Sequence, residues 1–350
     1  MSRAALVAAV ICLSIAPIAI RQADAQSSAD YQVIYATAKA LSRQLDAAAR
    51  EGYACHLVAQ PEPGTVLQGV VVLLLRTEAP PASLAHRVLT GGRLGSGLPG
   101  SLESAGNDGF GLCGVVLDEE APMPSVIAVM SRSDATSDTR RYGVEVLTNY
   151  KDSLARLNEK GREGFYPVAS APIDDNRVPE MRSWLVLTEQ LAERDTPREI
   201  AVRSNSGAGG LQRALDEQGA QGYRLDLLWK EGNDVVAMMT RPVGYPPELH
   251  AFAIDTTSLE KLHAVSHVYL ADAPFNPAGD RLVVSDPALL ATNDIEDDAL
   301  PQLNSLGYAD GLTRAGDHIS RHHGATPIAA RVRRLPDGSL RLTTILVQRL

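Results

Sequence analysis

Aromatic residues and cysteines are scarce in this 350-residue sequence: aromatic rings make up 5% of it, and cysteine occurs three times. So few rings argue against a carbohydrate-binding protein, which needs aromatic side chains as stacking platforms. The sequence also has no paired-cysteine zinc pattern, no Gly-x-Ser-x-Gly nucleophile elbow and no phosphate-binding P-loop. These absences remove the usual signatures of zinc proteins, serine hydrolases and nucleotide hydrolases.

Positive charge is also in deficit, because 33 basic residues face 42 acidic ones and the net charge is −9. A protein that binds nucleic acid needs a basic face to neutralise phosphates. We therefore expect no nucleic-acid partner.

Long hydrophobic runs are absent after the first 25 residues. At the N-terminus, the basic Arg3 precedes an apolar run over residues 4–20, and Ala23-Asp24-Ala25 has the small-x-small form of a cleavage site. This pattern predicts a secretory signal peptide over residues 1–25, cleaved near Ala25. The mature chain would then be periplasmic or secreted, soluble and without a membrane span. The alternative is an uncleaved anchor, but the run is at the lower limit for spanning a bilayer.

Two cysteines, Cys55 and Cys113, remain in the predicted mature chain. An oxidising compartment permits a disulfide bond between them. However, Cys55 lies three residues after Gly52 and Cys113 four residues after Gly109, so equivalent strands would point the two side chains to opposite faces. A disulfide and two buried thiols both remain open.

What the sequence does contain is a nine-residue signature in four copies, with a leucine at its start and a Gly-aromatic pair at its end. The copies are Leu45–Tyr53, Leu102–Phe110, Leu157–Phe165 and Leu215–Tyr223. Their Gly residues, Gly52, Gly109, Gly164 and Gly222, recur at nearly constant spacing. Such a regular period predicts several copies of one supersecondary unit.

The fourth copy shows the expected unit most clearly. Residues 199–203 alternate as a short strand, and 211–218 place Leu211, Ala214 and Leu215 on one helical face. Alternation then resumes over 223–227 and 235–240, on either side of a Glu-Gly-Asn-Asp turn. We therefore predict an α+β fold of tandem βαββ repeats that form antiparallel sheets, with helices packed on one face.

The repeats divide the chain after the signal peptide. We expect repeats at 26–80 and 81–133, a linker at 134–139, and further repeats at 140–192 and 197–243. Two degenerate repeats follow at 246–287 and 288–350, the second with a helix from Asn293 or Asp294 to about Leu306 and an insertion at 311–324. Units of about 50 residues bury too little apolar surface to be stable alone. We expect them to pair into two or three compact domains.

These residues resemble a family of short bacterial modules of unknown function. That family has a Tyr-led strand, a helix that ends in Leu-Asn-x-x-Gly-x-x-Gly-Trp, and two further strands. Residues 157–165 are the most similar copy, although Phe165 replaces the tryptophan, and acidic residues replace the asparagine in the other copies. The resemblance covers about the first 240 residues. It implies a fold and no catalytic residues.

An arginine ends the predicted third strand in three copies, as Arg76, Arg132 and Arg241, and Arg349 repeats this near the C-terminus. One interpretation is an anion-binding ring. We prefer a charged terminus on an edge strand, which would discourage edge-to-edge pairing.

Residues 95–100, Gly-Ser-Gly-Leu-Pro-Gly, match the dinucleotide-binding fingerprint, and Asp118 lies downstream. We interpret them as a turn, because the other copies lack the pattern and the expected unit is not a parallel crossover. We therefore predict no cofactor.

Histidines are concentrated after residue 249. His263 and His267 are four apart on a predicted helix, and His318 and His322 repeat this spacing within the expected insertion, beside His323. Residues four apart share a helical face, so each pair could bind one metal ion. His318, His322 and His323 are our candidate metal ligands, although the pairs specify no third ligand. Exposed structural or capping histidines are the alternative.

No set of residues resembles a catalytic centre. We therefore predict an exported, non-enzymatic repeat protein that binds another protein or a cell-envelope component through sheet edges or helix faces. The alternative is a metal-binding protein or metal-dependent enzyme centred on the histidine-bearing insertion.

Overall fold

The structure is a computed structural model. It describes residues 30–61, 69–77, 83–92, 96–118, 125–133, 139–147, 150–174, 182–191, 196–206, 208–231, 234–247, 252–254, 267–269, 280–284, 288–291, 308–321, 325–334 and 340–349. No helix within these ranges has the length and apolarity needed to cross a bilayer. The predicted signal peptide lies outside them.

Through the first 219 residues, three or four strands separate each helix from the next. The helices are α1 (Ala38–Arg50), α2 (Leu98–Asn107), α3 (Tyr150–Arg162), α4 (Ala208–Gly219) and α7 (Tyr308–Ser320). The strands before residue 192 are β1 (Tyr31–Ala36), β2 (Tyr53–Val58), β3 (Gln60–Pro61), β4 (Val70–Arg76), β5 (Ala85–Gly91), β6 (Gly111–Asp118), β7 (Ser125–Arg132), β8 (Arg140–Leu147), β9 (Tyr166–Asp174) and β10 (Arg182–Leu191). The later strands are β11 (Arg198–Ser206), β12 (Arg224–Glu231), β13 (Asp234–Pro242), β14 (Phe252–Ile254), β15 (His267–Tyr269), β16 (Asp280–Val284), β17 (Ala288–Ala291), β18 (Ala325–Arg334) and β19 (Leu340–Arg349).

The strands form five sheets, and the fold is mixed α+β. The first three sheets have the orders β1-β4-β2, β5-β7-β6 and β8-β10-β9, and the fourth is β11-β13-β12-β15; all four are antiparallel. The fifth sheet is β14-β16-β19-β18-β3, with β17 also paired to β19. In the first, second and fourth sheets the strand that carries the signature arginine, Arg76, Arg132 or Arg241, is therefore central. The prediction that these arginines protect an edge strand is wrong, because a central strand has no free edge.

The signature glycines lie where a helix gives way to a strand. Gly52, Gly109, Gly164 and Gly222 have φ between 81° and 92°, a conformation that costs residues with a Cβ atom. Phe110 N–H donates to Ala105 O, and the equivalent bonds of the third and fourth sheets are Phe165 N–H to Lys160 O and Tyr223 N–H to Gln218 O. These are the six-to-one bonds that close a helix C-terminus. A glycine is required there so that the chain can reverse and start the next strand.

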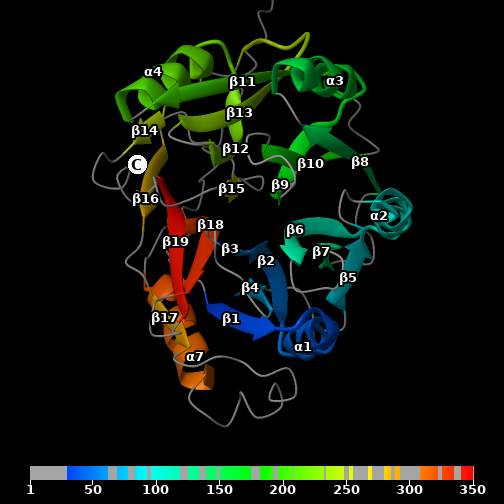
Figure 1. The fold of residues 1–350 in the computed structure, drawn as a ribbon, viewed down its shortest axis with the longest axis vertical. Coiled ribbons are helices and arrows are strands. Elements are labelled where there is room, and N and C mark those ends of the chain that lie inside the picture. Colours follow the sequence, from blue (N-terminus) through cyan, green and yellow to red (C-terminus); the bar gives the residue numbers. More distant parts are fainter. Residues whose placement is uncertain are drawn as a thin grey trace, which may run out of the picture.

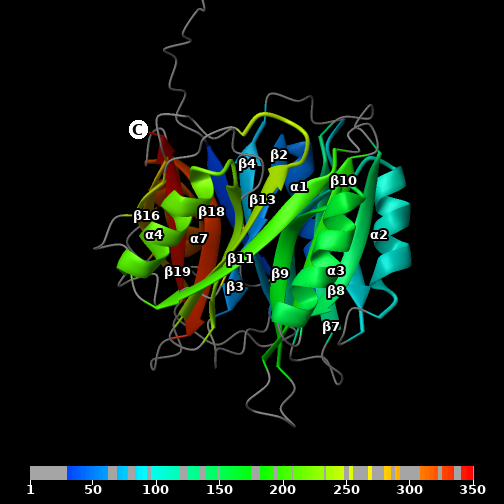
Figure 2. The same ribbon diagram turned by 90° about the horizontal axis from the view of Figure 1, so that it is seen from above.

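The sheets follow one another around a central axis, with the helices on the outside (Figure 1). Strands β2, β6, β9 and β12 of the first four sheets lie towards the middle, together with β18 of the fifth sheet. Figure 2 shows the same arrangement from above, with α2, α3 and α4 on the periphery. We expected separate pairs of units. Instead, the apolar cores connect each of the first three sheets to both of its neighbours.

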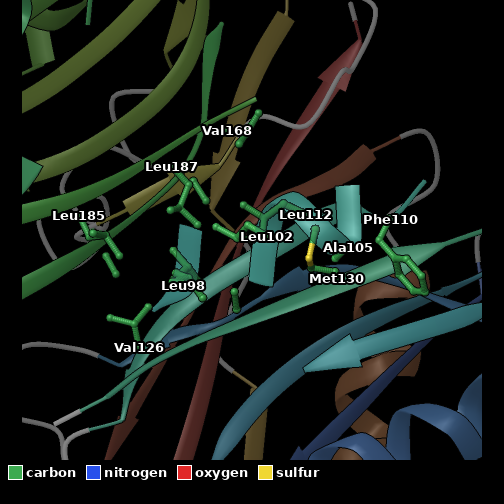
Figure 3. Close-up of a cluster of buried hydrophobic side chains, with 14 of the residues drawn as sticks. Leu98, Leu102, Ala105, Phe110, Leu112, Val126, Met130, Val168, Leu185 and Leu187 are labelled. Atoms are coloured by element: carbon green, nitrogen blue, oxygen red, sulfur yellow. The ribbon is translucent and has the colours of Figure 1, made fainter. Parts of the chain in front are cut away.

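Each core cluster lies between two successive sheets. The cluster in Figure 3 joins Leu98 and Leu102 of α2 and Met130 of the second sheet to Leu185 and Leu187 of the third. Another cluster joins α1, and the face of the first sheet that it covers, to Cys113 and Val129 of the second sheet. The next cluster joins the third sheet to the fourth. A further cluster joins the fifth sheet and α7 to Tyr31 and Val33 of the first sheet. Contacts between the last and the first sheet close the ring.

A glycine lets each of α2, α3 and α7 approach the first strand of a neighbouring sheet. A Cβ atom on Gly106 of α2 would lie 2.2 Å from Arg140 O of β8, and one on Gly161 of α3 would lie 2.5 Å from Arg198 O of β11. Where α7 meets β1 of the first sheet, a Cβ atom on Gly316 would lie 2.3 Å from Tyr31 O. The backbone therefore packs against backbone at all three junctions.

Helix α7 occupies most of the range that we expected to be an insertion, 311–324. It packs on β1, and Ser320 Oγ accepts a hydrogen bond from Tyr31 N–H at 3.0 Å. Its Leu312 and Gly316 are four residues apart, like Leu102 and Gly106 or Leu157 and Gly161 inside the signature. We did not recognise this similarity because no Gly-aromatic pair follows. The helix predicted from residue 293 or 294 to about 306 lies outside the described residues.

Candidate functional site

The arginines singled out from the sequence stack on the signature aromatic rings. Arg76 Cζ lies 4.5 Å from the ring centroid of Tyr53, Arg132 Cζ 4.8 Å from that of Phe110, and Arg241 Cζ 4.7 Å from that of Tyr223. In the third sheet Gln190 takes this position. There the cation over Phe165 comes instead from Arg141 on the first strand, at 5.6 Å, and from Lys160, at 5.1 Å.

The same side chains bond to the end of the preceding helix. Arg76 Nη1 donates to Glu51 O at 3.2 Å, Arg132 Nη1 to Asp108 O at 2.8 Å, and Arg241 Nη1 to Gln221 O at 3.2 Å. In the third sheet Gln190 Nε2 donates to Glu163 O at 2.7 Å. A cation near a helix C-terminus is favoured by the helix dipole and satisfies a carbonyl that has no intrahelical partner.

Two of these arginines are also paired with carboxylates. Arg76 contacts Asp30 at 2.6 Å, and Arg241 contacts Glu199 at 2.6 Å. Burial acts to raise the pKa of Asp30, but hydrogen bonds from Arg76 and Tyr53 outweigh it and lower that pKa. The arginines therefore have internal partners, which supports a structural role and not the anion-binding ring.

The polar residue of the signature reaches the edge of the next sheet. Asn158 Nδ2 donates to Ile200 O at 3.2 Å, and Asn158 Oδ1 accepts from Ile200 N–H at 2.9 Å. The side chain therefore covers both backbone groups of Ile200 on edge strand β11. Asp46 has the equivalent place on α1, and its charge acts on His86 of β5. This protection of strand edges could not be inferred from the signature alone.

A charged cluster joins the third and fourth sheets. Arg140 pairs with the buried Glu189, which also accepts a hydrogen bond from Tyr166 Oη at 3.3 Å. Arg198 and Arg224 lie over the ring of Tyr166, with Cζ 4.8 and 5.4 Å from its centroid.

The second carboxylate of this cluster is the buried Asp226, to which Arg224 Nε donates at 3.0 Å. Burial raises the pKa of Asp226, and Arg224 opposes that shift. The cluster thus places three arginines against two buried carboxylates, which ties two sheets together. Sequence analysis did not identify it, because its residues are far apart in the chain.

Cys55 and Cys113 form a disulfide bond between β2 and β6, with 6.0 Å between their Cα atoms. The two residues do point to opposite faces of their own sheets. The sheets stack front to back: the face of the first sheet that α1 covers packs against the face of the second sheet that α2 does not cover. The offset that argued against the bond is therefore the arrangement that permits it.

A groove of about 780 Å³ lies beside α3, the start of β11 and the end of β13. Leu154, Ala155 and Val243 contribute apolar surface, and the polar lining consists of Asn158, Glu159, Arg162, Arg198 and Glu199. Val243 and Tyr245 are the large hydrophobic side chains exposed among the described residues, at 48% and 62%. Val243 N–H donates to Pro197 O at 2.8 Å, which holds this segment against β11.

The side chains of the candidate metal ligands, His318, His322 and His323, lie outside the described residues, so their prediction stays a prediction. His318 lies on α7, and His263 falls outside the description. His267 opens strand β15, so the prediction that it lies on a helix with His263 is wrong. No group of three or more His, Cys, Asp or Glu side chains in the described ranges could hold a metal ion.

The second half of the glycine-rich pattern, residues 98–100, forms the first turn of α2. Gly97 has φ 79° immediately before the helix, and Pro99 is tolerated in the first turn. Strands β5 and β6 are not adjacent, since β7 lies between them. Both strands are antiparallel to β7 and therefore parallel to each other, but they are not the adjacent parallel strands of a dinucleotide-binding crossover.

Comparison with protein-family models gave no match, and no curated protein matches the chain. The resemblance to short bacterial modules therefore stays a prediction.

Proposed function

We propose that this chain is an exported, non-enzymatic protein built from tandem βαββ units that binds another protein or a cell-envelope component. The observation that carries the proposal is the exposure of Val243, which lines the groove at α3, and of Tyr245, two residues further along the chain. Exposed apolar side chains next to a concave surface, rimmed by charged residues, are typical of interaction sites. Tyrosine in particular is enriched where proteins bind each other.

The internal roles of the signature residues support this interpretation. The glycines, aromatic rings and arginines stabilise the helix-to-strand junctions, so their recurrence needs no catalytic explanation. The helices also cover first-strand edges, as Asn158 does at Ile200. Of the two kinds of surface expected from the sequence, we therefore favour the helix faces over the sheet edges, and specifically the face of α3.

Crosslinking in cells tests the proposed function. A photoreactive amino acid would replace Tyr245 in the full-length chain, and another would replace the exposed Arg43 on α1 as the control. We expect a discrete crosslinked partner from position 245 that is absent from position 43. If position 245 gives only the background of position 43, the proposed binding function at this surface is wrong.

The proposal includes export. The mature protein would begin after Ala25, in the periplasm or outside the cell. Intact-mass measurement of protein recovered from the producing cells tests this: a mass that retains residues 1–25 would contradict cleavage at that point.

A further inference from the structure

The groove beside α3 has a chemistry that restricts what can occupy it. Its lining includes two acidic residues, Glu159 and Glu199, and two basic residues, Arg162 and Arg198. Polyanions such as nucleic acids or anionic lipid surfaces need a field of one sign. A polypeptide, which can carry an apolar side chain and charges of both signs in a few residues, fits this lining better.

The openness of the site also favours a polypeptide over a small molecule. Ala155, Glu159 and Arg162 are exposed residues of α3. Small-molecule sites instead enclose most of the surface of their ligand. Tyr245, two residues after the lining residue Val243, is a further exposed apolar side chain that a larger partner could contact.

The groove cannot bind its partner by adding a strand at Ile200. Asn158 already occupies Ile200 N–H and O, and Val243 N–H occupies Pro197 O. Addition of a strand depends on free backbone groups at a sheet edge. Recognition at this position must therefore come from side chains.

We propose that the groove binds a segment of a partner polypeptide, which inserts one apolar side chain between Leu154 and Val243, against Ala155, and places charges of both signs beside Glu159 and Arg162. This inference rests on the proposed function, since it names the class of partner for the same surface. The apolar anchor would supply most of the affinity, because buried anchors dominate interface energetics. The charged pairs at the rim would set its orientation and register.

Selection from a library of short random peptides tests the inference, with the full mature chain as bait. We expect selected peptides to share one large apolar residue flanked by charged residues. Ala155→Arg fills the groove, and Ala47→Arg places the same side chain at an exposed position of α1. Ala155→Arg and Val243→Asp should weaken peptide binding at least about tenfold, whereas Ala47→Arg should change it less than about twofold.

Circular dichroism of each variant would show that it is folded. Selected peptides that bind equally well to Ala155→Arg overturn the inference, as do a purely acidic consensus or a failure to select any peptide. A monomer–dimer equilibrium abolished by Ala155→Arg would also overturn it, since the occupant would then be a second copy. These results leave the proposed function standing if position 245 still crosslinks a partner in cells. Loss of that crosslink is the separate result that removes the function.

Discussion

The backbone N–H of Cys55 donates a hydrogen bond to Nε2 of His86, with 3.0 Å between the two nitrogens. The bond joins β2 of the first sheet to β5 of the second, beside the disulfide bond. The neighbouring residue, His56, joins the same strand to the last sheet: its Nε2 lies 2.7 Å from Pro327 O. Two consecutive residues of β2 therefore connect the first sheet to both of its neighbours.

These contacts predict acid sensitivity. His86 Nε2 must be unprotonated to accept from Cys55. Burial lowers the pKa of His86, against the opposing charge of Asp46, and burial lowers the pKa of His56, against its bond to Pro327. When the folded pKa lies below the unfolded value, the unfolded state binds more protons as the pH falls. The stabilisation is therefore complete above the unfolded pKa of about 6.5 and is lost progressively below it.

Urea unfolding between pH 5 and 8 measures this effect. The free energy of unfolding of the wild type should fall as the pH decreases below about 6.5. His86→Gln and His56→Gln should each reduce the slope, and the double variant should reduce it further. Equal slopes in all four proteins would show that these histidines do not control the acid response.

The disulfide bond should contribute strongly to stability. It closes a loop with a sequence separation of 58, for which the chain-entropy estimate is about 4 kcal/mol. The Cys55→Ser, Cys113→Ser double variant should lose about 2–4 kcal/mol in urea unfolding. Reduction of the wild type should give the same loss and should leave the double variant unchanged. A difference between the two proteins under reducing conditions would contradict the assignment to the bond.

The close approach of α3 to β11 predicts that Gly161→Ala is destabilising. The new Cβ atom would lie 2.5 Å from Arg198 O, so the helix must shift and loosen its packing on the next sheet. We expect a loss of about 1–3 kcal/mol.

Gly100→Ala is the matched control, because Gly100 lies in α2 with nothing within 4 Å of an added Cβ. It should be neutral or stabilise by up to about 1 kcal/mol, since alanine has the higher helix propensity. Thermal unfolding compares the two, and equal shifts would show that the contact at Gly161 is unimportant.

The buried carboxylate of Glu189 predicts a large effect of charge removal. Glu189→Gln leaves Arg140 without its partner in a mostly buried position, which should cost about 3 kcal/mol. Glu163→Gln removes the same charge from the exposed pair with Lys160 and should cost less than about 0.5 kcal/mol. Chemical denaturation of both variants tests the difference. Similar small losses would show that the cluster between the third and fourth sheets contributes little.

Much of the local structure was predictable from the sequence. The leucine-to-glycine spacing located α1, α2, α3 and α4, and the Gly-aromatic pairs located the junctions where each helix ends. The physical reason is local: a positive φ admits few residues other than glycine, and alternation of apolar residues follows from the strand itself. Helix α7 was missed because its junction lacks the aromatic residue, although Leu312 and Gly316 were present.

Contacts between sheets could not be predicted from the sequence. The offset of Cys55 and Cys113 correctly indicated that the two side chains point to opposite faces of their own sheets. Whether they could form a disulfide bond depended on the front-to-back stacking of the two sheets. The arginines were recognised as strand ends. The strand order showed that those strands are central, and the side-chain packing showed that Arg76, Arg132 and Arg241 stack on aromatic rings. The groove at α3 combines residues 154–162, 198–199 and 243, which no motif connects.

The amino-acid sequence by itself determined where helices end and strands begin, because backbone conformation and apolar periodicity act over a few residues. Only the tertiary structure decided which faces meet, which edges are covered and which side chains remain exposed. Those outcomes depend on how one sheet packs against the next, and that packing joins residues such as Tyr31 and Gly316 from opposite ends of the chain.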